Sequence, residues 1–360
     1  HLSRAPSTAS TTRPSAARRP AAAFRELSTG ETTPPRRRCV VATRGWPVAA
    51  KFATLLALYA AHTLLLSRGC LPLPCQLVPN DFGLWQSVGY DSLVGGAVVA
   101  LRAAHVAARS PAERPPPPRP TLPSRRRLAA TILALAVAYN FSGYAAWASD
   151  ECLYELSLRG AHVSTAMRRA VQVLSGHLAW VLSGALILRA GAKNFFARGE
   201  HRWFDFNVDG DWLWWVAGGY AASALAFNVA DGLNHFVVPS VLFDDDTLVT
   251  RMINPEDNDV VALVAGSIAP CVTAPVWEEA LYRGFLLKAL VPFAGPAAAL
   301  PLSAVLFAAH HLTLTAALPL AVLGGLWGHI YVAARQNLLV PALIHALWNA
   351  RVFLGALLGL

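Results

Sequence analysis

Long apolar stretches are the feature of this sequence that most restricts its fold. A helix that crosses a bilayer needs roughly 20 apolar residues, because about 30 Å of hydrocarbon is spanned at 1.5 Å per residue. The sequence therefore predicts an all-α fold, a polytopic transmembrane helical bundle of about 8–9 spans. The candidate spans are residues 48–66, 92–108, 128–148, 171–188, 212–230, 259–290, 297–312, 316–333 and 339–358.

Composition agrees with a membrane protein and argues against an ordinary soluble enzyme. Hydrophobic residues make up 55% of the 360 residues and charged residues 14%, whereas soluble domains contain about 45–50% and about 25%. The net charge is +9, but residues 1–46 contribute nine arginines against two glutamates and leave the remainder nearly neutral. We therefore expect no nucleic acid among the partners.

The N-terminal segment and a proline-rich tract divide the chain. Residues 1–46 are rich in Arg, Ser and Thr and poor in acids, which is typical of an organelle transit peptide without a fold of its own. A disordered cytosolic tail is the alternative. Residues 47–110 then form N-terminal membrane spans, 111–127 a Pro-rich linker, 128–211 further spans and loops, and 212–360 a C-terminal domain.

Ionisable residues interrupt the apolar pattern in the last hundred residues. Such groups are costly inside a bilayer, by at least about 2.5–3.5 kcal/mol each, so their presence points to a function. Glu279 and Arg283 are four residues apart on a predicted helix, the spacing of an ion pair. Glu278 lies about 140° around the helix from Arg283 and is left free to face the interior. The alternative is that the whole cluster sits at the membrane interface.

Two later spans carry histidines. His311 lies one turn after Phe307, whereas His310 is rotated by about 100°, so we expect His310 and His311 to face different surroundings. His345 and Asn349 are four residues apart and share a helix face. A single buried histidine is commonly a satisfied core residue. Polar groups on three separate predicted helices favour one shared site.

Such a set of groups suits hydrolysis of a peptide bond. A glutamate and two histidines in a dry cavity can activate a water molecule, either directly or through a divalent metal. An Asn amide beside a histidine can donate to the oxyanion of a tetrahedral intermediate. The sequence contains no serine elbow, P-loop or dinucleotide fingerprint. A transporter that uses the buried groups as a proton or metal path is another interpretation.

Three motifs carry a family resemblance. They read EEALYR at 278–283, FAAHH at 307–311 and HALWN at 345–349. They resemble the EExxxR, FxxxH and HxxxN motifs of the type II CAAX prenyl endopeptidase family, which includes bacteriocin-processing and immunity membrane proteases. The similarity covers roughly residues 212–360. It implies an intramembrane endopeptidase, of the metallo- or glutamate-type, whose substrate is a hydrophobic or prenylated protein held in membrane lipid.

The resemblance also implies roles for the motif residues. Glu278 is the expected water-activating base with His311 as its partner, and His345 and Asn349 are the expected oxyanion-stabilising pair. Glu279 and Arg283 would support the first helix. The cofactor is either a divalent metal such as zinc, held by Glu278, His311 and His345, or none.

The leader and the phrase EEALYRGFL are similar to the plastid branch of this family. That similarity predicts an integral protein of the thylakoid or envelope membrane, with the endoplasmic reticulum or another organelle membrane as the alternative location. Because some members of that branch act as scaffolds, a non-catalytic scaffold or regulator is the alternative function.

Overall fold

The computed structural model describes residues 43, 45–63, 90–108, 120–197, 202–243 and 247–358. Every named element in these residues is helical, so the predicted all-α fold is confirmed. The elements are α2 (Val48–Ala61), α3 (Tyr90–Ala108), α4 (Arg125–Leu158), α5 (Thr165–Gly191), α6 (Trp212–Val237), η4 (Ser240–Phe243), α7 (Leu248–Ile253), η5 (Glu256–Asn258), α8 (Val260–Ile268), η6 (Ala269–Thr273), α9 (Ala274–Glu279), η7 (Ala280–Leu286), α10 (Leu287–His310), η8 (Leu314–Ala316), α11 (Ala317–Ala333) and α12 (Leu339–Leu358).

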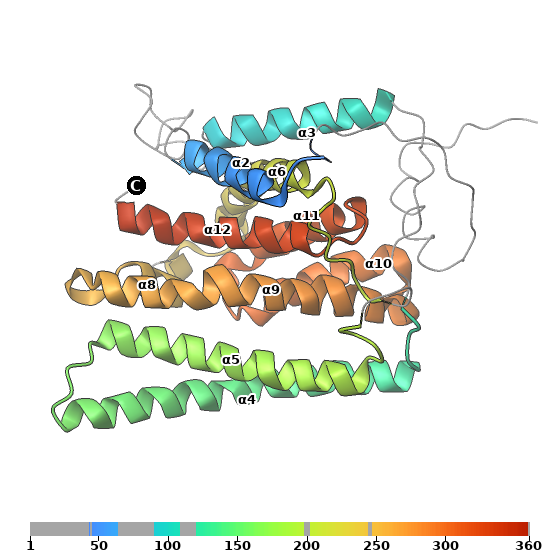
Figure 1. Ribbon diagram of the computed structural model, residues 1–360. Coiled ribbons are helices and arrows are strands. Elements are labelled where there is room, and N and C mark those ends of the chain that lie inside the picture. Colours follow the sequence, from blue (N-terminus) through green and yellow to red (C-terminus); the bar gives the residue numbers. More distant parts are fainter. Residues whose placement is uncertain are drawn as a thin grey trace, which may run out of the picture.

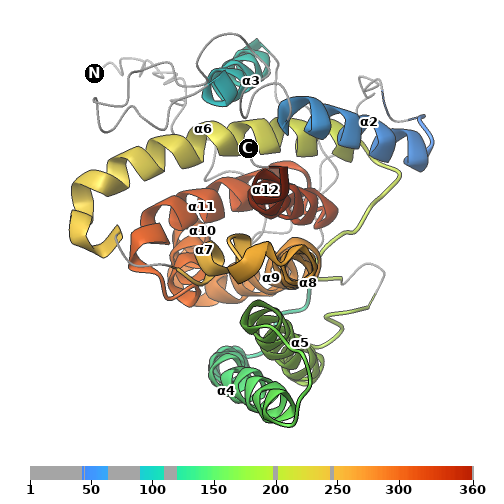
Figure 2. The ribbon, with the colours of Figure 1, turned by 90° about the vertical axis from the view of Figure 1, so that its left-hand side faces the viewer.

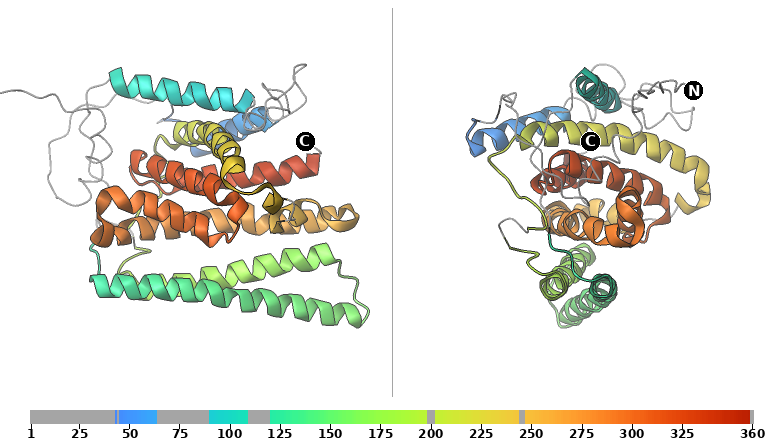
Figure 3. Two further views of the ribbon diagram at one scale, coloured as in Figure 1. Left: turned by 180° about the vertical axis from the view of Figure 1, so that it is seen from behind. Right: turned by 90° about the vertical axis from the view of Figure 1, so that its right-hand side faces the viewer.

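Helices α3, α4, α5, α9 and α12 run roughly parallel to one another, whereas α6 runs across them (Figure 1). The segment α8–α10 and helices α11 and α12 make up the middle of the molecule. Helix α6 crosses one side of this group, with α2 and α3 beyond it (Figure 2). The antiparallel hairpin α4–α5 covers the opposite side, where α5 contacts α8 (Figure 3). The central layer is therefore enclosed by helices that come from the N-terminal part of the chain.

Serine caps begin both helices of the hairpin. The Ser124 side chain accepts a hydrogen bond from the Arg127 N–H at 3.4 Å, and Ser164 accepts one from the Met167 N–H at 3.1 Å. Such caps satisfy backbone donors that the first helical turn leaves free. The expected linker of residues 111–127 therefore ends at Ser124, and residues 125–127 belong to α4. Residues 111–119 of that predicted linker, and nearly all of the predicted transit peptide, lie outside the described residues.

Helices that are long and apolar enough to span a membrane are present, and the number of crossings stays a prediction. Five helical stretches among the described residues are long and apolar enough to cross a bilayer: Arg125–Leu158, Thr165–Gly191, Val260–His310, Leu314–Ala333 and Leu339–Leu358. The third, of 51 residues, combines two predicted spans, 259–290 and 297–312. Gly295 has the non-helical angles φ 79° and ψ 165° and breaks this stretch between them. The count of about 8–9 crossings is not settled by these helices.

Large apolar side chains lie on the outer surface of the hairpin as well as in the core. Leu133, Phe141 and Trp147 on α4 are more than half exposed, as is Leu182 on α5. Exposed apolar surface of this extent is typical of a protein that faces lipid rather than water. The buried core is rich in aromatic rings, with Trp203, Trp212, Trp327, Tyr331, Phe285 and Phe307 all nearly inaccessible. The chain is a membrane protein with a packed interior.

Candidate active site

Helix α9, which ends in the two glutamates, is flanked by two π-helical turns. The turn η6 precedes it and the turn η7 follows it. A π-helical turn adds one residue to a helical turn and is frequent at functional sites, because it changes the direction in which side chains point. Glu278 is 6% exposed and Glu279 is fully buried. Both carboxylates are therefore held inside the central layer of helices.

The Glu279 carboxylate is neutralised by its neighbours. Its Oε1 atom accepts hydrogen bonds from Arg283 Nη1 at 2.8 Å and from His345 Nδ1 at 3.1 Å. The other guanidinium nitrogen of Arg283, Nη2, donates to the Gly324 carbonyl at 2.9 Å, and the guanidinium lies 4.7 Å from the Phe307 ring centre. The ion pair expected from the spacing of four residues is present. Through Arg283 the glutamate helix is joined to α11, and through the bond between Glu279 and His345 it is joined to α12.

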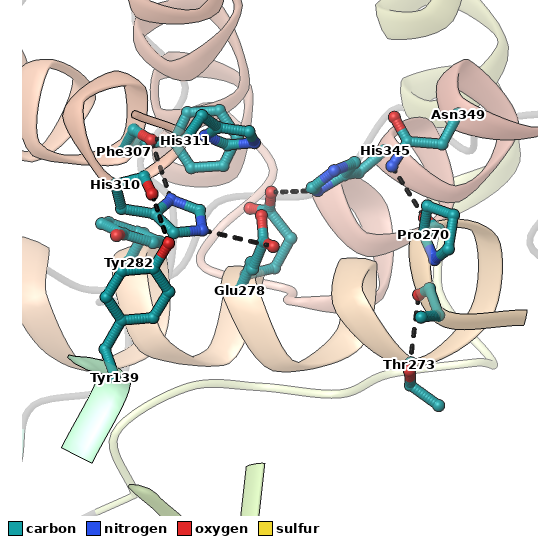
Figure 4. Close-up of polar contacts among 12 residues, drawn as sticks. Tyr139, Pro270, Thr273, Glu278, Tyr282, Phe307, His310, His311, His345 and Asn349 are labelled. Atoms are coloured by element: carbon teal, nitrogen blue, oxygen red, sulfur yellow. Dashed lines mark hydrogen bonds and ion pairs between the residues drawn. The ribbon is translucent and has the colours of Figure 1, made fainter. Parts of the chain in front are cut away.

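Glu278 faces a pair of histidines instead of a cation. Its Oε1 atom lies 3.6 Å from His310 Nε2 (Figure 4). One ligand atom from each of Glu278, His310 and His311 lies within 4.8 Å of the others, an arrangement that could hold a metal ion. The two rings are 4.2 Å apart between centres. The two side chains therefore face the same carboxylate.

The expectation that His310 and His311 face different surroundings is wrong. Helix α10 ends at His310, and His311 is its C-cap. At this end both imidazoles turn back to one acceptor, the Phe307 carbonyl, with Nδ1 distances of 3.0 Å for His310 and 2.8 Å for His311. Because a carbonyl oxygen only accepts, Nδ1 carries the proton in both rings. The Nε2 atoms are left with lone pairs that can accept a proton or bind a metal.

His345 and Asn349 both belong to α12 but have different partners: His345 points toward the glutamates, and Asn349 points toward Pro270 of η6 (Figure 4). The His345 ring is held by Glu279 and lies 4.6 Å from the Trp327 ring. The Asn349 amide donates to the Pro270 carbonyl of η6 at 2.7 Å. Of the residues expected to hold a metal, the structure gathers Glu278 and His311 and adds His310, whereas His345 is not part of that group.

Several buried polar atoms around Glu278 have no hydrogen-bond partner in the described part of the chain. Most buried polar groups in native proteins are hydrogen-bonded, so a concentration of unsatisfied ones indicates a place for water or a polar ligand. The unsatisfied atoms include Glu278 Oε2, Glu279 Oε2 and Trp277 Nε1 on α9, and Trp180 Nε1 and His177 Nε2 on α5. The surroundings of Glu278 are thus polar enough to receive water or a polar part of a substrate.

Two residues of this region could not be found from the sequence. Tyr139 of α4 donates its hydroxyl to the His310 carbonyl at 2.6 Å. Trp180 of α5 packs against both Trp277 and His310, at ring distances of 5.8 and 5.3 Å. Both lie in apolar stretches that contain other aromatic residues, and no motif distinguishes them.

Comparison with known proteins identifies the part of the chain that carries this arrangement. Residues 260–351 match a family model, described as type II CAAX prenyl endopeptidase Rce1-like. Over this segment the chain is similar to that family. The segment begins with α8, ends within α12, and includes all six of the residues assigned by the motifs. The resemblance seen in the motifs is confirmed.

The Rce1-like segment is shorter than the expected C-terminal domain of residues 212–360, and α6 lies outside it. The boundary at residue 212 stays a prediction. Neither the curated proteins nor the solved structures contain a match to the chain.

Proposed function

We propose that the chain is an intramembrane endopeptidase of the type II CAAX prenyl protease family. The observation that carries the proposal is the placement of Glu278, which meets two imidazoles at the end of a membrane-spanning helix inside the Rce1-like segment. The Glu278 carboxylate faces imidazole nitrogens and is not paired with the Arg283 guanidinium, which binds Glu279. It can therefore accept a proton from water.

In the proposed reaction Glu278 and the two histidines bind and activate one water molecule. The carboxylate accepts a proton as the water oxygen attacks the scissile carbonyl, and a tetrahedral oxyanion forms. The proton then passes to the leaving nitrogen as the C–N bond breaks, which yields one carboxylic acid and one amine. We assign the support of the oxyanion to Asn349, since only one of the two N–H groups of its amide is engaged by Pro270, and to His345 in its doubly protonated form, because its Nδ1 already donates to Glu279.

The donor set also fits a divalent metal. Zinc in catalytic sites takes three nitrogen or oxygen ligands from the protein and keeps one position for water. Glu278, His310 and His311 supply one oxygen and two nitrogens that lie within 4.8 Å of one another, and we propose these three residues as its ligands. A bound zinc ion would supply Lewis acidity that favours hydroxide at neutral pH.

The substrate and the location follow from the family rather than from the contacts. The family description names prenyl endopeptidases, so we propose that the substrate is a hydrophobic or prenylated membrane peptide. Because residues 1–46 have the composition of a transit peptide, we propose a plastid membrane, thylakoid or envelope, as the location. Import of the full chain fused to a fluorescent protein tests that location.

Proteolysis by the purified full chain in liposomes tests the activity. Peptides that end in Cys followed by three further residues are compared with the cysteine prenylated and plain, with and without a chelator. We expect Glu278→Gln to abolish cleavage, whereas Glu155→Gln, a matched change at an exposed position of α4, leaves it intact. Loss of activity with the chelator and recovery with zinc would support the metal. Equal cleavage by wild type and Glu278→Gln would refute the role of Glu278, and the absence of cleavage by the wild type would leave the scaffold function.

A further inference from the structure

The hairpin α4–α5 contacts the histidine pair although it lies outside the Rce1-like segment. Tyr139 is in the middle of α4, and its hydroxyl reaches the carbonyl of His310, 171 residues later in the chain. Trp180 of α5 lies against Tyr139, with ring centres 5.0 Å apart. Tyr139 points to the end of α10 (Figure 4), and Trp180 packs against the His310 ring at the same end.

Aromatic rings surround the His310 imidazole. The ring centres of Trp180, Tyr139 and Tyr282 lie 5.3, 5.4 and 5.5 Å from it. Trp180 and Tyr282 are inclined by only 35° and 34° to the imidazole plane, whereas Tyr139 meets it edge-on at 74°. A ring enclosed on three sides cannot change rotamer without displacing a neighbour. The direction of its Nε2 atom toward Glu278 is therefore imposed by its surroundings.

The end of α10 needs such support. The last carbonyls of a helix have no partner within the helix, and the Tyr139 hydroxyl satisfies one of them, that of His310. Two residues later Leu312 adopts the left-handed angle φ 53° while 81% exposed. A leucine in that conformation is strained, so the turn would relax if its contacts were removed. Relaxation of this turn would carry both imidazoles away from Glu278.

We propose that Tyr139 and Trp180 are positioning residues, which hold His310 and His311 against Glu278. The inference rests on the proposed hydrolysis at Glu278 and extends it to the α4–α5 hairpin. It implies that the Rce1-like segment alone does not complete the site. Removing either contact should slow the chemical step without weakening the binding of substrate.

Conservative variants test the proposal. Tyr139→Phe removes one hydroxyl, and Trp180→Phe replaces the indole by a smaller phenyl ring. Tyr144→Phe and Trp147→Phe on α4 are matched controls, because these side chains are 66% and 61% exposed. For Tyr139→Phe and Trp180→Phe we expect kcat to fall about 10-fold to about 100-fold, as for other residues that orient reacting groups, with KM within about twofold of the wild type. The controls should match the wild type in both constants.

A second measurement does not depend on proteolysis. Modification of His310 and His311 by diethyl pyrocarbonate, followed by mass spectrometry of the full chain in liposomes, reports how firmly the pair is enclosed. We expect modification to be at least about threefold faster in Tyr139→Phe and Trp180→Phe than in the wild type, and unchanged in the controls.

The two measurements separate the proposals. Faster modification in a chain that cleaves none of the peptides would sustain the positioning role while the proposed hydrolysis fails. Cleavage and modification rates equal to those of the wild type in both Tyr139→Phe and Trp180→Phe would overturn the positioning role and leave the hydrolysis standing.

Discussion

Gly184 lies on α5 where that helix passes close to the residue before Glu278. A Cβ atom at position 184 would lie 2.3 Å from Cζ2 and 2.7 Å from Cη2 of Trp277. Ordinary contacts begin at 3.4 Å, so the indole ring must retreat by about 1.1 Å, the difference between 3.4 and 2.3 Å, in the variant Gly184→Ala. Trp277 is 5% exposed and already packs against Trp180. The ring therefore has little space into which it can move.

The size of the effect follows from this overlap. An extra methyl group in a well-packed core costs about 1–3 kcal/mol, and the gain of alanine over glycine in a helix offsets about 0.5–1 kcal/mol of it. Because Glu278 directly follows Trp277, a shift of the indole moves the carboxylate as well. A misplacement of about 1 Å can cost on the order of 100-fold in rate. We expect Gly184→Ala to unfold more easily by about 1–2 kcal/mol and kcat to fall on the order of 100-fold.

Thermal unfolding in detergent and cleavage in liposomes measure the two effects. The matched control is Gly143→Ala on α4, where an added Cβ meets nothing within 4 Å, and we expect this variant to be neutral or slightly stabilised. The double variant Gly184→Ala/Trp277→Phe should recover part of both losses, because the smaller ring leaves room for the methyl group. If Gly184→Ala behaves like Gly143→Ala, the close contact does not position Glu278 and the reasoning is refuted.

Two further predictions concern charged groups. Arg283→Met leaves the buried Glu279 carboxylate without its cation and should cost about 3–5 kcal/mol of unfolding free energy. The double variant Glu279→Gln/Arg283→Met should lose less, and equal losses would contradict the pairing. Asp259 accepts hydrogen bonds from the Ser164 hydroxyl (2.6 Å) and the Ala262 N–H (2.9 Å), which hold the pKa of its carboxyl below the usual range. Its contribution to stability is complete above the usual pKa and fades as the pH falls through the lowered value. Melting temperatures between about pH 7 and about pH 3 should therefore drop further for the wild type than for Asp259→Asn, whose side chain does not titrate in that range; equal drops would exclude this role for Asp259.

Much of the fold could be predicted because the spans depend on local composition. The apolar stretch 171–188 falls inside α5, and 339–358 coincides with α12. The pairing of Glu279 with Arg283 was predictable for the same reason, since residues four apart on a helix are neighbours. The motif residues stood out because ionisable groups are rare within apolar segments.

The parts that could not be predicted depend on helix ends and on distant packing. The rotation of about 100° between successive residues separates His310 from His311 only while a helix continues. At the end of α10 both rings are free to turn to Phe307. The contact of Tyr139 with His310 and the closeness of Gly184 to Trp277 join segments that are far apart in the chain. Neither contact has a local signal.

The two adjacent glutamates have opposite surroundings, and this difference explains why the site needs both. Two carboxylates side by side in a buried place repel each other, so neither can be kept there ionised without compensation. Glu279 receives that compensation from Arg283 and His345 and in return fixes the relative positions of three helices. Glu278 lies against the His310 imidazole, and its other oxygen has no hydrogen-bond partner among the described residues. Exchanging the two roles would require Arg283 to reach the other face of its helix. The sequence Glu-Glu-x-x-x-Arg therefore combines one structural carboxylate with one that is available for chemistry.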